Sequence, residues 1–141
     1  MTQTLSVEEE IQRPAAEVWE GLTDWSNASK WMPGIEGMAA DGDTAVGTKL
    51  TFRARGAERS SAIVRCDTGT MIVLRSVQGG VTADYRYEVH DIDGRSTRVT
   101  LVADCHVTGL WWRIVSPLLR IAIRSTDGKQ LRLLKAMIER E

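Results

Sequence analysis

Two tyrosines in one alternating segment are the residues of this sequence best placed to do chemistry or to orient a ligand. Residues 81–91 alternate between apolar and polar types, and Tyr85 and Tyr87 both fall on the apolar face. Positions i and i+2 of a strand share a face, so both phenols would point to the same side of a sheet. A phenol can donate and accept hydrogen bonds and can act as a general acid or base. Two interpretations stay open: both rings belong to the core, or both line a cavity and orient a polar group of a ligand.

Other catalytic or metal chemistry finds little support in the sequence. His90 and His106 fall on the polar faces of their segments, where we expect them to be exposed. No Gly-x-Ser-x-Gly elbow is present, and no Ser/His/Asp arrangement follows from the spacing. Asp41-Gly42-Asp43 is similar to part of a calcium loop but lacks the later Glu ligand, which favours a turn. We therefore expect no metal and no cofactor.

The composition is that of an ordinary globular protein. The chain has 141 residues, of which 43% are hydrophobic and 26% charged. A chain of this length can bury a core without disulfides or metal. Its net charge of -1 gives no field that would attract nucleic acid. We expect residues 1–141 to form a single domain with no nucleic-acid partner.

The cysteines and the N-terminus predict the compartment. Cys66 and Cys105 are too few for a disulfide framework, lack metal-ligand spacing and lie in apolar segments. We expect them to be buried thiols in a reducing environment. The opening residues MTQTLSVEEE lack the basic and apolar regions of a signal peptide, and no apolar run is long enough to span a membrane. These features predict a cytoplasmic protein.

A strand and a short helix are the first elements that must support the tyrosines. Residues 4–12 alternate as a half-buried strand does, although Glu9 falls on the apolar face. Pro14 suits the first turn of a helix, where its missing N–H costs nothing. The apolar stripe of this helix comprises Ala15, Val18, Trp19 and Leu22.

A second short helix follows and brings more aromatic side chains. Asp24 can cap it, and Pro33-Gly34 ends it. Its apolar positions are Trp25, Ala28 and Trp31. Trp25 adjoins the cap, and we expect it to be partly exposed.

Six strand-like segments follow and predict an antiparallel sheet. They lie at residues 35–40, 50–54, 58–67, 70–77, 81–91 and 99–107. Gly56, Asp67-Thr68-Gly69 and Asp93-Gly94 mark turns between neighbouring segments. Hairpin connections favour an antiparallel sheet with one solvated face. The apolar face would offer cavity walls from Phe52, Leu74, Leu101 and Ala103, with room beside the small Ala54 and Ala83. The facing of Arg65 and Arg75 stays open because residues 71–74 do not alternate.

The C-terminal part has a helical pattern. Residues 110–123 are mostly apolar, and Leu131, Leu134 and Ile138 form a stripe further on. Pro117 either starts the long helix or kinks it. Trp111 and Trp112 point about 100° apart on a helix, so both cannot face the core in the same way. Three interpretations stay open for this pair: dense packing on the sheet, a gate for an apolar ligand, or a patch for self-association or a membrane surface.

The order of these elements resembles the START-like helix-grip superfamily (SRPBCC), in particular its polyketide cyclase/dehydrase-type branch. The resemblance covers essentially the whole chain and is carried by Pro14-x-x-x-Val18-Trp19, by Leu22-x-Asp24 and by Trp31-x-Pro33. It implies an α+β fold in which a curved antiparallel sheet of about six to seven strands grips a long C-terminal helix. It also implies a cavity between the two, in which members bind lipids, sterols, polyketides or plant-hormone-like molecules and a minority do chemistry. In this family the two short helices close one end of the sheet, so the resemblance implies that Trp19 and Trp31 fill that end, as large aromatic side chains can.

The function that follows is binding of a small hydrophobic or amphipathic ligand, lipid- or polyketide-like, between the sheet and the C-terminal helix. The ligand-binding residues we expect are Phe52, Leu74, Tyr85, Tyr87, Leu101, Ala103, Trp112 and Leu119. One alternative is a cyclase, dehydratase or aromatase, for which the two tyrosines and an arginine of the pocket are the acid or base candidates. Another is a membrane-surface or partner-binding module that uses the apolar patch from Trp111 to Leu119.

Overall fold

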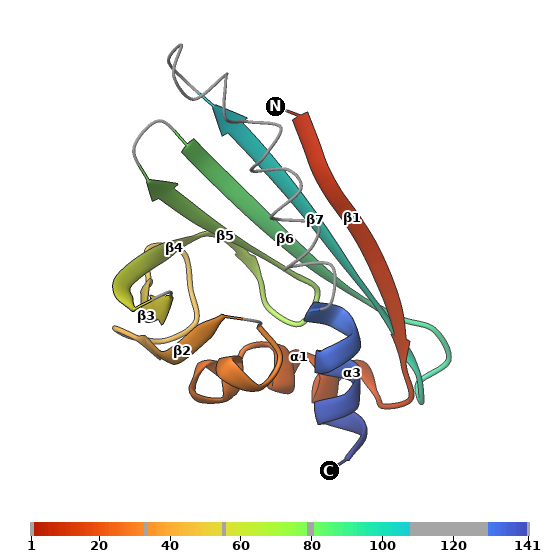
Figure 1. Ribbon diagram of the computed structural model, residues 1–141. Helices are drawn as coiled ribbons and strands as arrows, with labels where there is room; N and C mark the ends of the chain where they lie inside the picture. The colour runs from red at the N-terminus through yellow and green to blue at the C-terminus, as the bar shows by residue number, and fades with distance from the viewer. Residues whose placement is uncertain (1, 33, 55, 79–80, 108–129, 141) are drawn as a thin grey trace.

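The computed structural model describes residues 2–32, 34–54, 56–78, 81–107 and 130–140. Seven antiparallel strands form one sheet in the order β1-β7-β6-β5-β4-β3-β2. Their bounds are β1 Thr2–Ile11, β2 Ile35–Ala40, β3 Lys49–Ala54, β4 Ala57–Asp67, β5 Met71–Gln78, β6 Val81–Asp91 and β7 Thr97–Val107. From β2 to β7 each strand pairs with the next in sequence, which confirms the predicted hairpins, while β1 pairs with β7. Figure 1 shows that the β2–β4 side curls away from the flatter β5–β7 side.

The predicted alternation fixes which side of the sheet faces the interior. Tyr87 lies opposite Ile72 on β5 and Leu101 on β7, and all three are buried. On the other side of β6, Arg86 and Glu88 are partly exposed and paired with each other. Glu9 does fall on the inner face, where it lies opposite Val99 and is half-buried. The sheet therefore has one apolar inner face and one charged outer face, as hairpin-connected strands favour.

Two short helices follow β1 and close one end of the sheet. α1 (Ala15–Leu22) begins directly after Pro14, and its buried residues are Val18 and Leu22. η1 (Trp25–Lys30) is a 3-10 helix that begins after Asp24, whose carboxylate accepts hydrogen bonds from the side chains of Ser26 and Asn27. Figure 1 shows both helices at the lower end of the sheet, beside the C-terminal helix.

The C-terminal helix α3 (Gln130–Glu139) lies against the same end. Its buried stripe is the predicted one, with Leu131, Leu134 and Ile138 facing the core. Lys135 donates a hydrogen bond to the backbone oxygen of Glu10, and this contact ties the helix to β1. The predicted apolar segment 110–123, with Trp111, Trp112 and Leu119, lies outside the described residues.

The tryptophans confirm one expectation and correct another. Trp31 is completely buried and Trp19 is half-buried against the core, as expected for side chains that close the fold. Trp25 was expected to be partly exposed, which is wrong, because only 7% of it is accessible. Its indole N–H donates to the Thr44 hydroxyl over 3.1 Å, so the segment after β2 covers the ring.

No helix in the described parts of the chain is long and apolar enough to cross a membrane.

Candidate functional site

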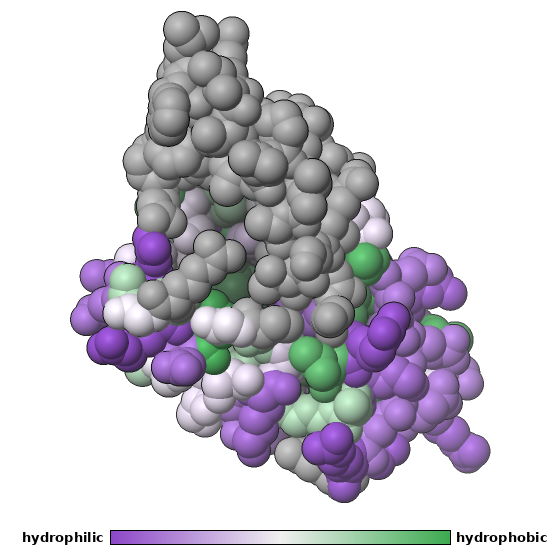
Figure 2. Space-filling model, viewed as in Figure 1, coloured by the Kyte–Doolittle hydropathy of each residue, from purple (hydrophilic) through white to green (hydrophobic). Residues whose placement is uncertain are grey.

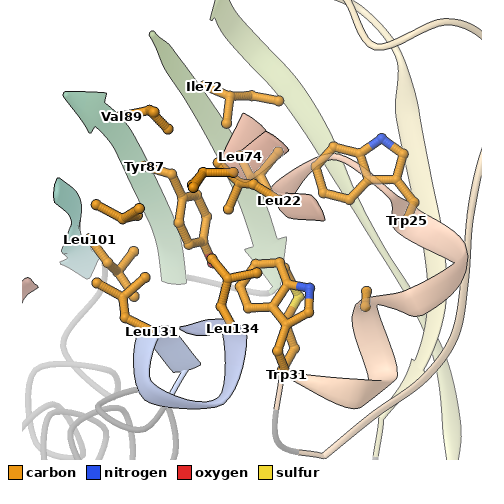
Figure 3. Packing of buried hydrophobic residues seen from close by; sticks show 14 of the residues in the cluster. Leu22, Trp25, Trp31, Ile72, Leu74, Tyr87, Val89, Leu101, Leu131 and Leu134 are labelled. Carbon is orange, nitrogen blue, oxygen red and sulfur yellow. The ribbon is translucent and has the colours of Figure 1, made fainter. Parts of the chain in front are cut away.

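The inner face of the sheet has a closed end, where side chains from every layer meet. Figure 3 shows the cluster, in which Leu22 and Trp25 from the N-terminal helices and Leu131 and Leu134 from α3 converge on β5–β7. Trp31 and Tyr87 meet edge to face, with ring centroids 5.8 Å apart and planes at 86°. This arrangement is the one that aromatic quadrupoles favour. Both rings are buried, and the closed end is part of the hydrophobic core.

A buried polar contact joins the sheet to the C-terminal helix within this cluster. The Tyr87 hydroxyl donates a hydrogen bond of 2.6 Å to the side-chain oxygen of Gln130, and both side chains are buried. The sequence left open whether the tyrosine hydroxyls lie at the rim of the core or line a cavity. For Tyr87 the hydroxyl lies inside, at the start of α3. It therefore holds the helix on the sheet.

The rest of the inner face is less covered. We call its part on β3–β6 the half-buried face and define it by these partly exposed inward residues: Phe52, Ala54, Arg59, Ser61, Ser76, Ala83 and Tyr85. Tyr85 is one inward position from Tyr87 along β6, yet it is half-buried where Tyr87 is 2% exposed. Ala83, one position further, is also half-buried. Burial thus decreases along one strand, away from the helices that close the fold.

Arg59 is the charged residue of this face, and the sequence analysis did not select it. β3 and β4 form a hairpin in which Ala54 lies opposite Ala57 and Phe52 opposite Arg59. Directly opposed residues share a face, so Arg59 lies inward with Phe52. The signal was present in the sequence, because the turn at Gly56 sets this register once Phe52 is assigned inward. Gly56 has a φ of 77°, which a tight hairpin turn requires.

The two arginines that the sequence left unassigned lie on the outer face. Arg65 is exposed and pairs with Asp67 at 3.6 Å. Arg75 lies opposite Asp84 and donates two hydrogen bonds to its carboxylate, at 2.8 and 3.0 Å. This hydrogen bonding, together with the negative charge of Asp84, raises the pKa of Arg75 above its ordinary value. Neither arginine is placed to meet a molecule on the inner face.

The remaining predicted wall residues are distributed between the two regions. Leu74, Leu101 and Ala103 are buried, and Phe52 packs against the core while half-exposed. Leu74 and Ala103 flank Tyr85 on the neighbouring strands, so these three form one row across β5–β7. Leu101 lies one row lower, opposite Tyr87. The predicted Trp112 and Leu119 lie outside the described residues, so their place relative to this row stays a prediction.

The histidines and cysteines form no metal-binding cluster in the described part of the chain. His90 and His106 are exposed on the outer face, as predicted. Cys105 is buried as predicted, but Cys66 is half-buried. Among residues 2–32, 34–54, 56–78, 81–107 and 130–140, no group of three His, Cys, Asp or Glu side chains could hold a metal ion. Asp41 accepts a hydrogen bond from the Lys49 backbone N–H, which places it in the turn that the sequence favoured.

A groove of about 380 Å³ lies outside the grip, between α1 and α3. Its floor includes Gly21 and Ile138, and its rim includes Arg13, Glu17 and Glu20. Arg13 is held there by the backbone oxygen of Glu139, at 2.9 Å. Figure 2 shows that the surface over this end is mainly hydrophilic, with a few hydrophobic side chains over α3. The rim is acidic and mostly solvated, and it offers no buried polar group for a ligand.

Comparison with known proteins matches a family to nearly the whole chain. The family described as "Polyketide cyclase / dehydrase and lipid transport" matches residues 2–139. A comparison with curated protein sequences found no match.

Solved structures give the same fold at low sequence identity. The Zhui aromatase/cyclase from Streptomyces sp. R1128 is similar with a TM-score of 0.80 and 16% identity over 96% of this chain and 93% of that one. A START superfamily protein from Mycobacterium smegmatis has a TM-score of 0.74 and 16% identity, over 96% and 97% of the two chains. Norcoclaurine synthase from Thalictrum flavum, in complex with dopamine and hydroxybenzaldehyde, has a TM-score of 0.71 and 18% identity over 97% of this chain and 86% of that one.

Proposed function

Because the chain belongs to the polyketide cyclase / dehydrase and lipid transport family, we propose that it binds a small hydrophobic or amphipathic molecule between the sheet and the C-terminal helix. The half-buried face carries this proposal. Phe52 and Tyr85 are large inward side chains that pack against the core and stay partly accessible. Their inward neighbours Ala54 and Ala83 have small side chains, which leave room beside them. Apolar concave surface with a few polar groups is what small-molecule sites expose.

The test is native mass spectrometry of the protein as purified from cells, followed by organic extraction of whatever is bound. We expect a discrete added mass of one small molecule. Ala83→Trp would fill the space on the inner face and remove the added mass. Thr82→Trp, the next residue on the outer face, is the matched control and would keep it. A bare chain mass, together with no binding of added apolar probes in solution, would contradict the proposal.

A second candidate is catalysis on a polyketide-like substrate, as a cyclase, dehydratase or aromatase. The observation that favours it is Tyr85, a phenol on the half-buried face of a fold shared with an aromatase/cyclase. Ring closure by aldol condensation and loss of water needs a group that gives and takes a proton. Tyr85→Phe should retain ligand affinity and abolish turnover of the extracted compound, whereas Tyr87→Phe, at the closed end, should lower stability and retain turnover. Unchanged turnover in Tyr85→Phe would remove its phenol as acid or base.

A further inference from the structure

We infer that the ligand carries an anionic group, a carboxylate in the simplest case, and that Arg59 on β4 is its counter-ion. This inference rests on the proposed function and adds to it the chemical class of the ligand: a small amphipathic acid. It is drawn from the position, burial and missing partner of Arg59.

The register of the sheet fixes the position of Arg59. Along β3, Leu50 is fully buried, so Leu50 and Phe52 are inward positions. Their partners on β4 are Ser61 and Arg59. The burial of β4 agrees, because Arg59, Ser61 and Ile63 are more covered than the outward Glu58 and Ser60. Arg59 therefore lies on the face that continues through Ile63 and β5 to Tyr85.

Arg59 has no partner among the residues that the structure describes. Neither a hydrogen bond nor an ion pair joins its guanidinium to any residue that the structure describes. By contrast Arg65 and Arg75 pair with carboxylates on the outer face. On the inner face of β3, β4 and β5, no described residue carries a carboxylate, so Arg59 is the sole charge there. A guanidinium that is partly withdrawn from water and has no counter-ion among these residues leaves its donors available to an anion from outside the chain.

The neighbours of Arg59 suit an amphipathic acid. Ser61 lies on the same face of β4, and Ser76 on the same face of β5, and both residues are half-buried. Phe52, opposite Arg59, supplies an aromatic surface for the apolar part of a ligand. A guanidinium binds a carboxylate through two parallel hydrogen bonds, which fixes orientation as well as charge. The polar head would thus lie at β4 and the apolar body along Phe52 toward Tyr85.

Matched pairs of probes separate this inference from the proposed function. The pairs are 2-naphthoic acid with 2-naphthamide, and decanoic acid with 1-decanol, titrated by calorimetry. In the wild-type protein each acid should bind about tenfold or more tightly than its neutral partner. Arg59→Gln should remove that preference while it leaves the neutral probes unaffected. Arg59→Lys keeps the positive charge but lacks the two parallel donors of the guanidinium, so it should restore part of the preference for the acids.

Arg65→Gln is the matched control, because it removes the same charge from the outer face of the same strand. It should retain the full preference for the acids, and circular dichroism should give the same fold for every variant. Equal affinity for acid and neutral probes, or a preference that survives Arg59→Gln, would overturn this inference and leave the proposed function intact. If no probe binds and the purified chain carries no small molecule, the proposed function fails and the inference fails with it.

Discussion

The closed end and the half-buried face belong to the same side of one sheet. Tyr87 lies in the closed end, and Tyr85, two residues earlier on β6, lies on the half-buried face. Tyr87 is covered by Trp31, Leu131 and Leu134 and gives its hydroxyl to Gln130. Tyr85 has the same residue type, the same strand and the same inward side, but it is half-buried. The difference comes from which elements lie over each ring. In Figure 3 the side chains around Tyr87 come from the N-terminal helices and α3 as well as from the sheet.

The comparison teaches that one apolar face can serve two purposes. Where helices cover it, each apolar side chain adds to the free energy of unfolding in proportion to the area it buries. Away from the described helices, the same residue types are only partly buried, and partly exposed apolar side chains can contact a ligand. We therefore expect substitutions at the closed end to change stability, and substitutions at the half-buried face to change binding.

Trp31→Ala should give the largest loss of stability. Trp31 is fully buried against Tyr87, and deletion of a buried tryptophan costs about 4 kcal/mol. Phe52→Ala on the half-buried face should cost about half of that or less, because part of its area is already in water. Urea denaturation followed by circular dichroism measures both. Equal losses would erase the proposed distinction between the two regions. Should Trp31→Ala not fold, Trp31→Phe makes the same comparison, since the indole N–H has no hydrogen-bond partner among the described residues.

Gly21→Ala should come next, because it tests the contact between α1 and α3 that closes the fold. A Cβ at Gly21 would lie 2.8 Å from Cγ1 and 2.9 Å from Cδ1 of Ile138. We expect a net loss of about 1.5 kcal/mol, the cost of overpacking less the gain in helix propensity. Gly42→Ala, where nothing lies within 4 Å, is the control and should change stability little. Adding Ile138→Val should recover part of the loss, and a stabilised Gly21→Ala protein would show that the two helices separate freely.

Tyr87→Phe should cost about 1 kcal/mol by removing the hydrogen bond between β6 and α3. A double-mutant cycle with Gln130→Met isolates this contact from the other neighbours of the two side chains. We expect a coupling energy of about 1 kcal/mol from the four denaturation curves. Strictly additive effects would mean that the bond does not fasten the helix to the sheet.

Glu139→Gln should have the smallest effect, and that effect should depend on pH. The backbone N–H of Gln12, and then Lys135, hold the pKa of the Glu139 carboxyl below its ordinary value of 4.5. A carboxyl with a lowered pKa in the folded state stabilises the protein above the unfolded pKa, and that gain is lost as pH falls through the folded pKa. The variant should therefore be less stable by about 0.5 kcal/mol at pH 7 and match the wild type in acid.

Thermal unfolding from pH 7 down to acid measures this difference. Glu58→Gln, an exposed residue on β4, serves as the control and should follow the wild type throughout. A gap between Glu139→Gln and the wild type that widens as the pH falls would contradict the role assigned to the carboxylate.

Much of the framework was predictable from patterns that span a few residues. The alternation of residues 81–91 gave the inward set of β6, and the stripe of Leu131, Leu134 and Ile138 gave the buried side of α3. The position of Arg59 was also predictable in principle, since the turn at Gly56 and the inward Phe52 fix the hairpin register. It was missed because a charged residue in a polar stretch does not disturb any apolar pattern.

How far each individual side chain is buried could not be predicted from the same patterns. Trp25 was expected to be partly exposed because it adjoins a helix cap, but the hydroxyl of Thr44, 19 residues away, accepts its indole N–H. The residues next to Trp25 and those next to Thr44 give no indication of this contact. The facing of Arg65 and Arg75 was equally undecidable from the sequence, because residues 71–74 do not alternate and an irregularity between Ile63 and Arg65 shifts the register of β4 against β5.

The sequence by itself determined the elements, their order and the inward side of most strands, because these depend on periodicity and turn chemistry among near neighbours. The tertiary structure alone decided which of two equivalent tyrosines is core and which lies on the half-buried face. Tyr87 meets Gln130 across 43 residues of chain, and Trp31 reaches it from another element. No periodicity encodes such contacts, since coverage of a side chain depends on where distant elements come to lie.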